Sequence, residues 1–420
     1  MSTKERILFI LCIIFFASLF SPVFIALKTI SMAALAAFSI AFPFIRPVSP
    51  VRIHKPFIFF TAAFAGWLLL STTWSDNAGD SSRFIVLRLP LIILPFTLGL
   101  VSTSLAFRNR LLLALAWIVL VAVSFSAASA TMYALRENNP DRFYNDYLSM
   151  AINQQSIYTS ALVNISIYIF TWALWRSKTT ARRVLYISAI LLLLVLGFLL
   201  ASRNMMVLLY GSIFLAAIYL VISRKKYIAG LAVLGTLAGL LVIIFSFFPK
   251  TLNRFNELRF TSYSFNSEAG EAHYSGNLSS EQWNGANFRL AAWSCGWELA
   301  KRAPVAGVGI GDKRDALYSV YQERDFKFGL RAKKNVHNNY LDILLSLGVI
   351  GLVLFTVGWL LIPAMVFIRR KDYLALWITI TLAFAMITEV YFDRSLGGLI
   401  FGFFIPLLLI GRGPRDTQAS

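Results

Sequence analysis

Apolar runs separated by short polar connections repeat along most of the chain. A helix needs about 20 predominantly apolar residues to cross a bilayer, and the runs have roughly this length. Lipid offers the backbone no hydrogen-bonding partner, so segments of this kind must be helical. The pattern predicts an all-α, polytopic membrane helical bundle of about 12 transmembrane helices. The expected spans are 7–26, 29–45, 56–74, 84–104, 111–135, 151–175, 184–201, 205–223, 227–248, 346–368, 373–393 and 395–411.

One polar connection is far longer than the others. It begins near residue 249, is rich in arginine, tryptophan and glycine, and ends on His337. We therefore expect nine spans in residues 1–248, one large, partly helical loop domain in residues 249–345, and three spans in residues 346–420. A multi-span protein with a single long loop of this composition is expected to carry its active site there.

The distribution of lysine and arginine predicts the orientation in the membrane. Cytoplasmic loops are rich in both residues, and basic connections alternate along this chain with connections that are poor in them. Both termini are therefore expected in the cytoplasm and the long loop on the outer face. The basic connections contain Lys4, Arg6, Arg46, Arg52, Lys55, Arg108, Arg110, Arg176, Lys178, Arg182, Arg183, Arg224, Lys225, Lys226, Arg369, Arg370, Lys371, Arg412 and Arg415.

Composition and net charge narrow the class of protein further. Hydrophobic residues make up 58% of the chain and charged residues 14%, whereas soluble domains carry roughly a quarter charged residues. The formal net charge of +19 is spread over many loops rather than gathered in one patch. That spread fits membrane orientation and contact with anionic lipids, and it argues against nucleic-acid binding.

Three charged residues on the outer side of the predicted bundle depart from the apolar pattern. Arg203 lies in the tight turn Ser202-Arg203-Asn204, and arginine offers a planar fork of donors suited to phosphate oxygens. Arg88 and Glu389 lie inside predicted spans near the outer face, where an unpaired charge costs several kcal/mol. Both are open to two interpretations, as snorkelling side chains or as the lining of a polar cavity.

The long loop contains one clear helical pattern and one glycine-rich stretch. Residues 287–303 predict a helix with Asn287 as its N-cap, on which Arg289, Trp293 and Trp297 share a face. This face suits an interfacial helix or a site for sugar and phosphate, although core packing explains either tryptophan alone. The following glycines, between Pro304 and Gly311, lack the strand and the Lys-Ser/Thr of a nucleotide loop and predict a tight backbone turn.

His337 stands where the loop meets the tenth span. Histidine exchanges protons near neutral pH, so His337 is a candidate base, and a helix-capping role is the alternative. We expect no metal site, because one histidine without a carboxylate cluster does not make one. Asp76 and Asp80 are the only nearby pair to consider, and two exposed aspartates in a turn seldom hold an ion.

These motifs together give the chain a family resemblance. It resembles the O-antigen ligases of Gram-negative bacteria and the related O-antigen polymerases. The resemblance rests on the Ser202-Arg203 turn, the Phe288-Arg289-x-x-x-Trp293 helix, the Pro304-x-x-Gly307-x-Gly309-x-Gly311 stretch, and His337-Asn338 before a helix with Leu347-Gly348. It covers roughly residues 195–360 plus the overall topology, and the first six spans contribute hydropathy only.

The resemblance implies a GT-C-like, inverting, metal-independent glycosyltransferase without a cofactor, in the bacterial inner membrane with its site facing the periplasm. The implied donor is O-antigen glycan on undecaprenyl diphosphate, and the implied acceptor is a hydroxyl of the lipid A–core oligosaccharide. His337 would be the base, with Asn338, Trp293 and Glu389 as supporting residues. The implied diphosphate clamp consists of Arg203, Arg289 and, more weakly, Arg88. An O-antigen polymerase remains the alternative within the family, and a lipid-linked glycan flippase is the alternative outside it.

Overall fold

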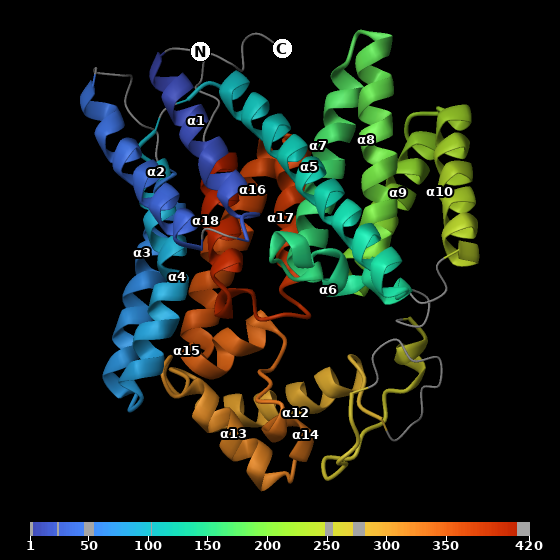
Figure 1. Ribbon diagram of the computed structural model, residues 1–420. Helices are drawn as coiled ribbons and strands as arrows, with labels where there is room; N and C mark the ends of the chain where they lie inside the picture. The colour runs from blue at the N-terminus through green and yellow to red at the C-terminus, as the bar shows by residue number, and fades with distance from the viewer. Residues whose placement is uncertain are drawn as a thin grey trace. The chain divides into compact units, whose positions relative to one another are not determined.

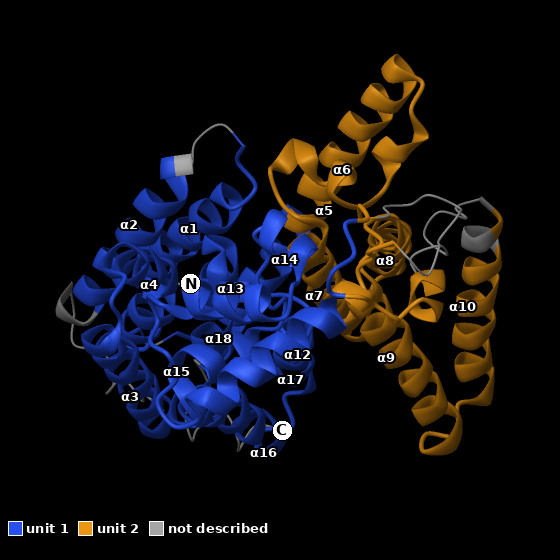
Figure 2. Cartoon of the chain, turned by 90° about the horizontal axis from the view of Figure 1, so that it is seen from below, with its two compact units in different colours: residues 1–118, 265–268, 289–420 blue, residues 119–264, 269–288 orange. Residues whose placement is uncertain are grey.

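The computed structural model describes residues 3–22, 25–45, 54–101, 103–247, 255–271 and 282–409. The predicted loop residues around His273 lie outside this range. The chain forms two compact units: unit 1 comprises residues 1–118, 265–268 and 289–420, and unit 2 comprises residues 119–264 and 269–288 (Figure 2). The described residues are predominantly helical and contain no β-strand.

A helix stands at the position of each predicted span (Figure 1). Within the described ranges, seven helices are long and apolar enough to cross a membrane by length and composition, which confirms an all-α polytopic membrane bundle. The helices are α1 (Thr3–Ser18), α2 (Ile25–Ile45), α3 (Lys55–Leu70), α4 (Ala78–Leu98), α5 (Leu105–Glu137), α7 (Ser156–Arg176), α8 (Thr180–Leu199), α9 (Arg203–Ile222), α10 (Tyr227–Phe247), α15 (Asn339–Phe355) with its continuation α16 (Ile362–Arg369), α17 (Tyr373–Ala385) and α18 (Ser395–Leu409).

Three predicted boundaries need correction. The first span was expected over 7–26, but α1 begins and ends earlier, at Thr3 and Ser18. Pro22 lies between α1 and α2, where proline disfavours a continuing helix. The tenth span begins at Asn339 rather than at residue 346, so the loop domain is shorter at its end than expected. The eleventh span, expected over 373–393, ends at Ala385. The residues that follow are held by contacts with other segments instead of continuing the helix.

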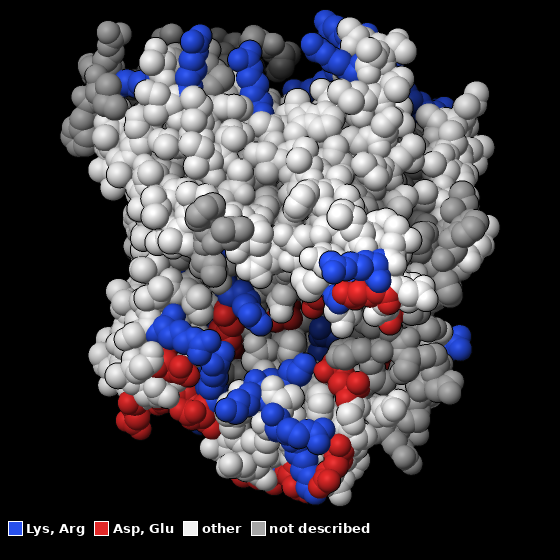
Figure 3. All heavy atoms as spheres, in the orientation of Figure 1, with Lys and Arg blue, Asp and Glu red and all other residues white. Residues whose placement is uncertain are grey.

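The long loop contains three helices of its own, α12 (Asn287–Arg302), α13 (Lys313–Glu323) and α14 (Lys327–Arg331). In unit 1, α13 and α14 lie at the end of the bundle where α3 leads into α4, and the chain from α16 to α17 turns at the opposite end (Figure 1). Over the helices of unit 1 in Figure 3, lysines and arginines stand at the upper end, and both signs of charge gather at the lower end. The uncharged surface between them is that of a bilayer-embedded bundle.

Helix α15 is broken at Gly348, and the loop fills the break. Gly348 has φ 67° and ψ −171°, and a Cβ there would lie 2.0 Å from Val305 O. The backbone N–H groups of Val308 and Gly309 donate to Leu345 O and Ser346 O, at 2.9 and 3.0 Å. A broken span must satisfy its backbone inside the protein. The glycine-rich stretch therefore has the backbone role that its sequence predicts, with positive φ at Gly307 and Gly309.

Unit 2 holds the helices around the predicted Arg203 turn. Asn164 on α7 donates from Nδ2 to Met205 O at 2.9 Å, which ties α7 to the first turn of α9. Phe198 and Met206 are buried together, with Tyr210, Leu240 and Phe255 packed against them. These contacts fix the short connection between α8 and α9, where Ala201 has φ 51°.

Candidate active site

His337 lies two residues before α15 and is half-buried. Its φ is 44°, a left-handed backbone conformation that is uncommon outside glycine. The Asn335 side chain stabilises this turn, because its Oδ1 accepts from His337 N at 3.0 Å. Asn338 is the N-cap of α15, and its Oδ1 accepts from Leu341 N at 3.0 Å. The capping role that the sequence left open for His337 therefore belongs to Asn338.

The imidazole of His337 pairs with Glu389. Its Nδ1 lies 3.0 Å from Glu389 Oε2, and both side chains are largely shielded, at 21% and 14% exposure. The sequence predicted that Glu389 lies inside the eleventh span. In the structure it lies instead in the connection between α17 and α18. A carboxylate on one ring nitrogen of histidine fixes the tautomer and leaves the other nitrogen to act as acceptor.

Glu389 is held in its ionised form. Burial alone would raise the pKa of this carboxyl, but the neighbouring His337, and after it Arg289, outweigh that effect. Val390 N also donates to Glu389 Oε1 at 3.2 Å. The pKa of Glu389 is lowered from its ordinary value as a result, so a negative charge faces the imidazole at neutral pH.

Arg289 reaches the same connection from α12. Its Nε donates to Thr388 O at 3.1 Å, which places the guanidinium beside Glu389. Close packing holds α12 in place, because a Cβ at Gly296 would lie 2.8 Å from Val336 Cγ1. The structure therefore brings Arg289, His337 and Glu389 together, although they are far apart in the sequence.

The two tryptophans of α12 differ in their surroundings. Trp293 is half-buried, and its Nε1 has no hydrogen-bond partner among the described residues. Trp297 is 53% exposed. The two tryptophans have the spacing predicted for one helix face, but Trp293 is half-buried and Trp297 is exposed. Asn287 is the first residue of α12 rather than its cap, and the Asn284 side chain accepts from Asn287 N at 3.1 Å. The capping role predicted for Asn287 therefore belongs to Asn284.

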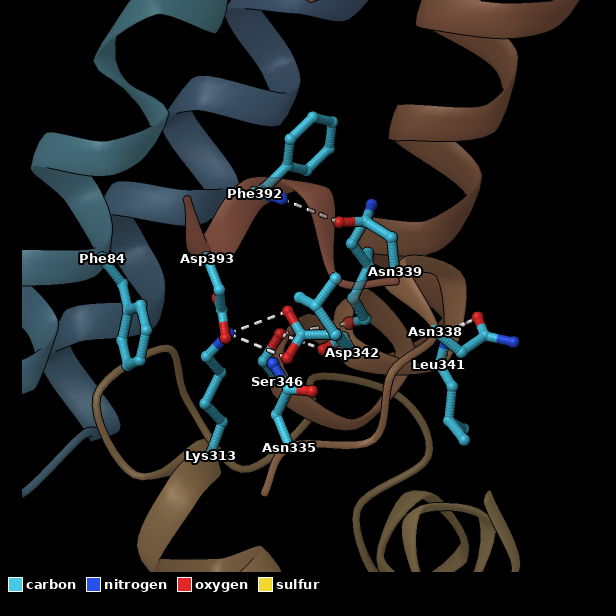
Figure 4. Close-up of polar contacts among 12 residues, drawn as sticks. Phe84, Lys313, Asn335, Asn338, Asn339, Leu341, Asp342, Ser346, Phe392 and Asp393 are labelled. Atoms are coloured by element: carbon cyan, nitrogen blue, oxygen red, sulfur yellow. Dashed lines mark hydrogen bonds and ion pairs between the residues drawn. The ribbon is translucent and has the colours of Figure 1, made fainter. Parts of the chain in front are cut away.

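Arg88 is neither a snorkelling side chain nor the wall of an open cavity. It is 1% exposed, and its Nη2 lies 3.1 Å from Asp342 Oδ2 and 3.6 Å from Asp393 Oδ1. A second cation, Lys313, lies in the same cluster, with its Nζ 2.8 Å from both oxygens of Asp342 and 2.6 Å from Asp393 Oδ1 (Figure 4). We call Arg88, Lys313, Asp342 and Asp393 the ion quartet.

The ion quartet was not anticipated from the sequence. Lys313 is the first residue of α13 and looks like an ordinary loop lysine, yet it is 2% exposed and lies over the Phe84 ring. One signal was available: Asp342 stands among apolar residues in the helical pattern that follows His337. A carboxylate on such a helix needs a cationic partner. The position of Arg88 makes it a member of this cluster rather than of a diphosphate clamp.

Arg203 lies in unit 2, whereas Arg289 and His337 lie in unit 1. It is the first residue of α9, and its Nη1 pairs with Glu257 Oε2 at 3.1 Å. Glu257 is 1% exposed and belongs to the short helix Glu257–Arg259. Arg203 is therefore an oriented, paired arginine within its own unit.

Asp76 and Asp80 lie at the connection between α3 and α4. Among the residues that the structure describes, no group of three or more histidine, cysteine, aspartate or glutamate side chains is placed to hold a metal ion. The backbone N–H groups of Asp76 and Asn77 instead donate to the two carboxylate oxygens of Asp312, each at 2.9 Å. These bonds fasten the start of α13 to the connection between α3 and α4.

Comparison with known families identifies the segment that carries most of these residues. Residues 188–356, less than half of the chain, match the family described as O-Antigen ligase, and this match confirms the resemblance to that family. No curated protein matches the chain. The matched segment includes Arg203, Arg289 and His337. The family implies a membrane glycosyltransferase of the ligase kind.

Proposed function

We propose that this protein is an O-antigen ligase that transfers O-antigen glycan from undecaprenyl diphosphate to a hydroxyl of the lipid A–core oligosaccharide. The observation that carries the proposal is the His337–Glu389 pair with Arg289 beside it, in and next to the segment matched to the ligase family. The reaction takes place at the periplasmic face of the inner membrane, with both termini in the cytoplasm. The alternation of basic connections supports this orientation.

His337 acts as the general base in this proposal. Its Nε2 takes the proton of the acceptor hydroxyl, while Glu389 holds Nδ1 and stabilises the imidazolium that forms. The hydroxyl oxygen bonds to the anomeric carbon, and the bond from that carbon to the diphosphate oxygen breaks with inversion. The electron pair of the broken bond leaves on the lipid diphosphate, and the proton stays on His337 until it is released.

Arginines stabilise the charge that grows on the diphosphate. Arg289 stands beside the His337–Glu389 pair. Arg203, held by Glu257 within unit 2, is the second arginine that the sequence motifs favour for the diphosphate clamp. Donors already aimed at developing charge lower the barrier without reorganisation. Arginine charges on a leaving diphosphate also perform the task that a divalent cation has in other transferases. We therefore propose a metal-independent mechanism.

The sister polymerase activity differs from ligation in its acceptor, which is another lipid-linked chain. Deletion of the gene from its host separates the two. Loss of the ligase leaves lipopolysaccharide without O-chain while lipid-linked O-chain accumulates. Lipopolysaccharide that still carries a single repeat unit after deletion would identify a polymerase and reject the proposed acceptor.

A further inference from the structure

We propose that the ion quartet is a positioning device that holds Glu389 against His337, with Lys313 as its central cation. The role of the quartet in catalysis rests on the proposed function of His337, whereas its geometry is independent of that function. The four side chains come from four separate segments: α4, the start of α13, the first turn of α15, and the connection after α17.

The quartet acts on Glu389 through the connection that contains both Glu389 and Asp393. Asn339, the first residue of α15, holds this connection at two points: its N donates to Met386 O at 2.9 Å, and its Oδ1 accepts from Phe392 N at 3.1 Å (Figure 4). Asp342 lies in the same first turn of α15 as Asn339. The quartet therefore clamps the connection to the turn that directly follows His337.

Lys313 links this clamp to the loop domain. Its ammonium contacts both carboxylates of the quartet and stands 4.1 Å from the centroid of the Phe84 ring. Asp312, the preceding residue, accepts from the backbone of Asp76 and Asn77, so the start of α13 cannot shift freely. A fixed lysine between two carboxylates fixes the carboxylates in turn, and Asp393 is only four residues from Glu389.

The charges of the quartet balance, since two cations face two anions, and all four side chains are at most 5% exposed. Removing one partner from a buried pair leaves an uncompensated charge in a low dielectric, which is strongly unfavourable. The segment that carries the orphan charge is then expected to move towards water. For Asp393, that segment is the connection that carries Glu389.

Buried ion pairs are weak evidence for stability, because apolar replacements of similar volume are often as stable. A quartet that only stabilised the fold would leave the pair at His337 unchanged in any variant that folds. If the quartet positions Glu389, the outcome differs, because a loosened connection withdraws the Glu389 carboxylate from His337. The imidazole then loses a negative neighbour, while Arg289 remains nearby.

The test uses the full-length protein in detergent, with Lys313→Met, Asp393→Asn and the double variant K313M/D393N. The double variant removes one charge of each sign and restores neutrality around Arg88 and Asp342. Arg108→Met is the matched control, because Arg108 and Asp372 form a second shielded ion pair, at 2.6 Å and with 7% and 16% exposure, at the opposite end of α17. Glu389→Gln is the reference for a lost carboxylate.

The readout is the rate at which diethyl pyrocarbonate modifies His337 at one fixed pH, followed by peptide mass spectrometry. It needs no transfer activity. We expect Lys313→Met to change this rate in the same direction as Glu389→Gln, whereas Arg108→Met leaves it unchanged. In transfer assays, Lys313→Met is expected to lower kcat by about 10²-fold, with little change in KM for the donor. This is the loss in rate expected when a catalytic group is displaced by about 1 Å. In the double variant, both the modification of His337 and kcat are expected to return most of the way to their parent values.

The inference is overturned if Glu389→Gln changes the modification rate and folded Lys313→Met or Asp393→Asn does not. It is also overturned if the double variant folds yet shows no recovery, since charge balance is then not what matters. Should both single variants fail to fold, a folded double variant whose modification rate is changed as much as that of Glu389→Gln still overturns the inference. Failure of the proposed function looks different: transfer would survive His337→Gln while the changes in modification rate stayed as described.

Discussion

His337 Nδ1 lies 3.0 Å from Glu389 Oε2, across a gap of 52 residues in the sequence. The pair joins the end of the loop domain to the connection between α17 and α18. With Nδ1 engaged by a carboxylate, Nε2 is the nitrogen that takes up the proton in the proposed mechanism.

His337→Gln is expected to lower the rate of transfer by about 10²–10⁴-fold, the usual contribution of a general base. Glutamine donates and accepts hydrogen bonds but does not take up the proton, and Asn338 already caps α15. Folding and binding of the lipid-linked donor should therefore persist. Transfer by purified protein and donor binding are measured in parallel. Near-native turnover with an unchanged pH–rate profile would remove His337 from catalysis.

Glu389→Gln is expected to reduce thermal stability in a pH-dependent way. The folded-state pKa of Glu389 is lowered from the ordinary carboxyl value of 4.5, so its stabilising effect is fully present above that pH. The effect is lost as the pH falls through the lower, folded-state pKa. The difference in Tm between parent and variant in detergent should be largest near neutral pH and should shrink below about pH 4.5. A constant difference across that range would contradict the ionised state of Glu389.

Arg289→Lys and Arg203→Lys are not expected to be conservative. Lysine keeps the charge but loses the planar fork of donors, and losing a donor to developing charge typically costs about 10²–10³-fold in rate. Transfer should fall by this order while the yield of folded protein holds. Arg302→Lys, in an exposed network with Glu298 and Glu323, is the control expected to retain activity. Native rates in both site variants would leave the arginines as lipid-headgroup contacts.

Chelation is expected to leave transfer intact. In the proposed mechanism, the guanidinium groups of Arg203 and Arg289 carry the diphosphate charge that a divalent cation would otherwise carry. Purified protein is assayed before and after EDTA treatment, with magnesium added back. Activity that disappears with the chelator and returns with magnesium would reject the arginine clamp as the main source of charge stabilisation.

Labelling of single cysteines tests the orientation. Gln322 on α13 and Arg369 at the end of α16 are both exposed, and the two native cysteines are free and buried. In a background without the native cysteines, Gln322→Cys should react with an impermeant thiol reagent on spheroplasts, and Arg369→Cys should react only after lysis. The reverse pattern would place the loop domain in the cytoplasm and overturn the proposed periplasmic site.

The sequence by itself determined the class of fold and the family that the chain resembles. Hydropathy is a local property, so each apolar run predicted a helix that the structure contains, and the glycine-rich stretch predicted a backbone turn that exists at Gly307 and Gly309. The motifs around Arg203, Arg289 and His337 predicted the family, which the match over residues 188–356 confirmed. Helix ends were less predictable: Ala385 ends α17 because the residues after it are bonded to Asn339 and His337.

Only the tertiary structure decided which charges meet. Arg88 and Glu389 stood out in the sequence because a charge in an apolar segment is costly. That cost does not indicate which residue pairs with the charge. Lys313 and Asp393 are 80 residues apart, and Arg88 and Asp342 are 254 apart. No helical or strand periodicity relates positions so distant, and their pairing depends on how four segments pack. The sequence therefore proposed His337 as the base, and the packing of unit 1 determined that Glu389 stands beside it and that Arg88 belongs to the ion quartet.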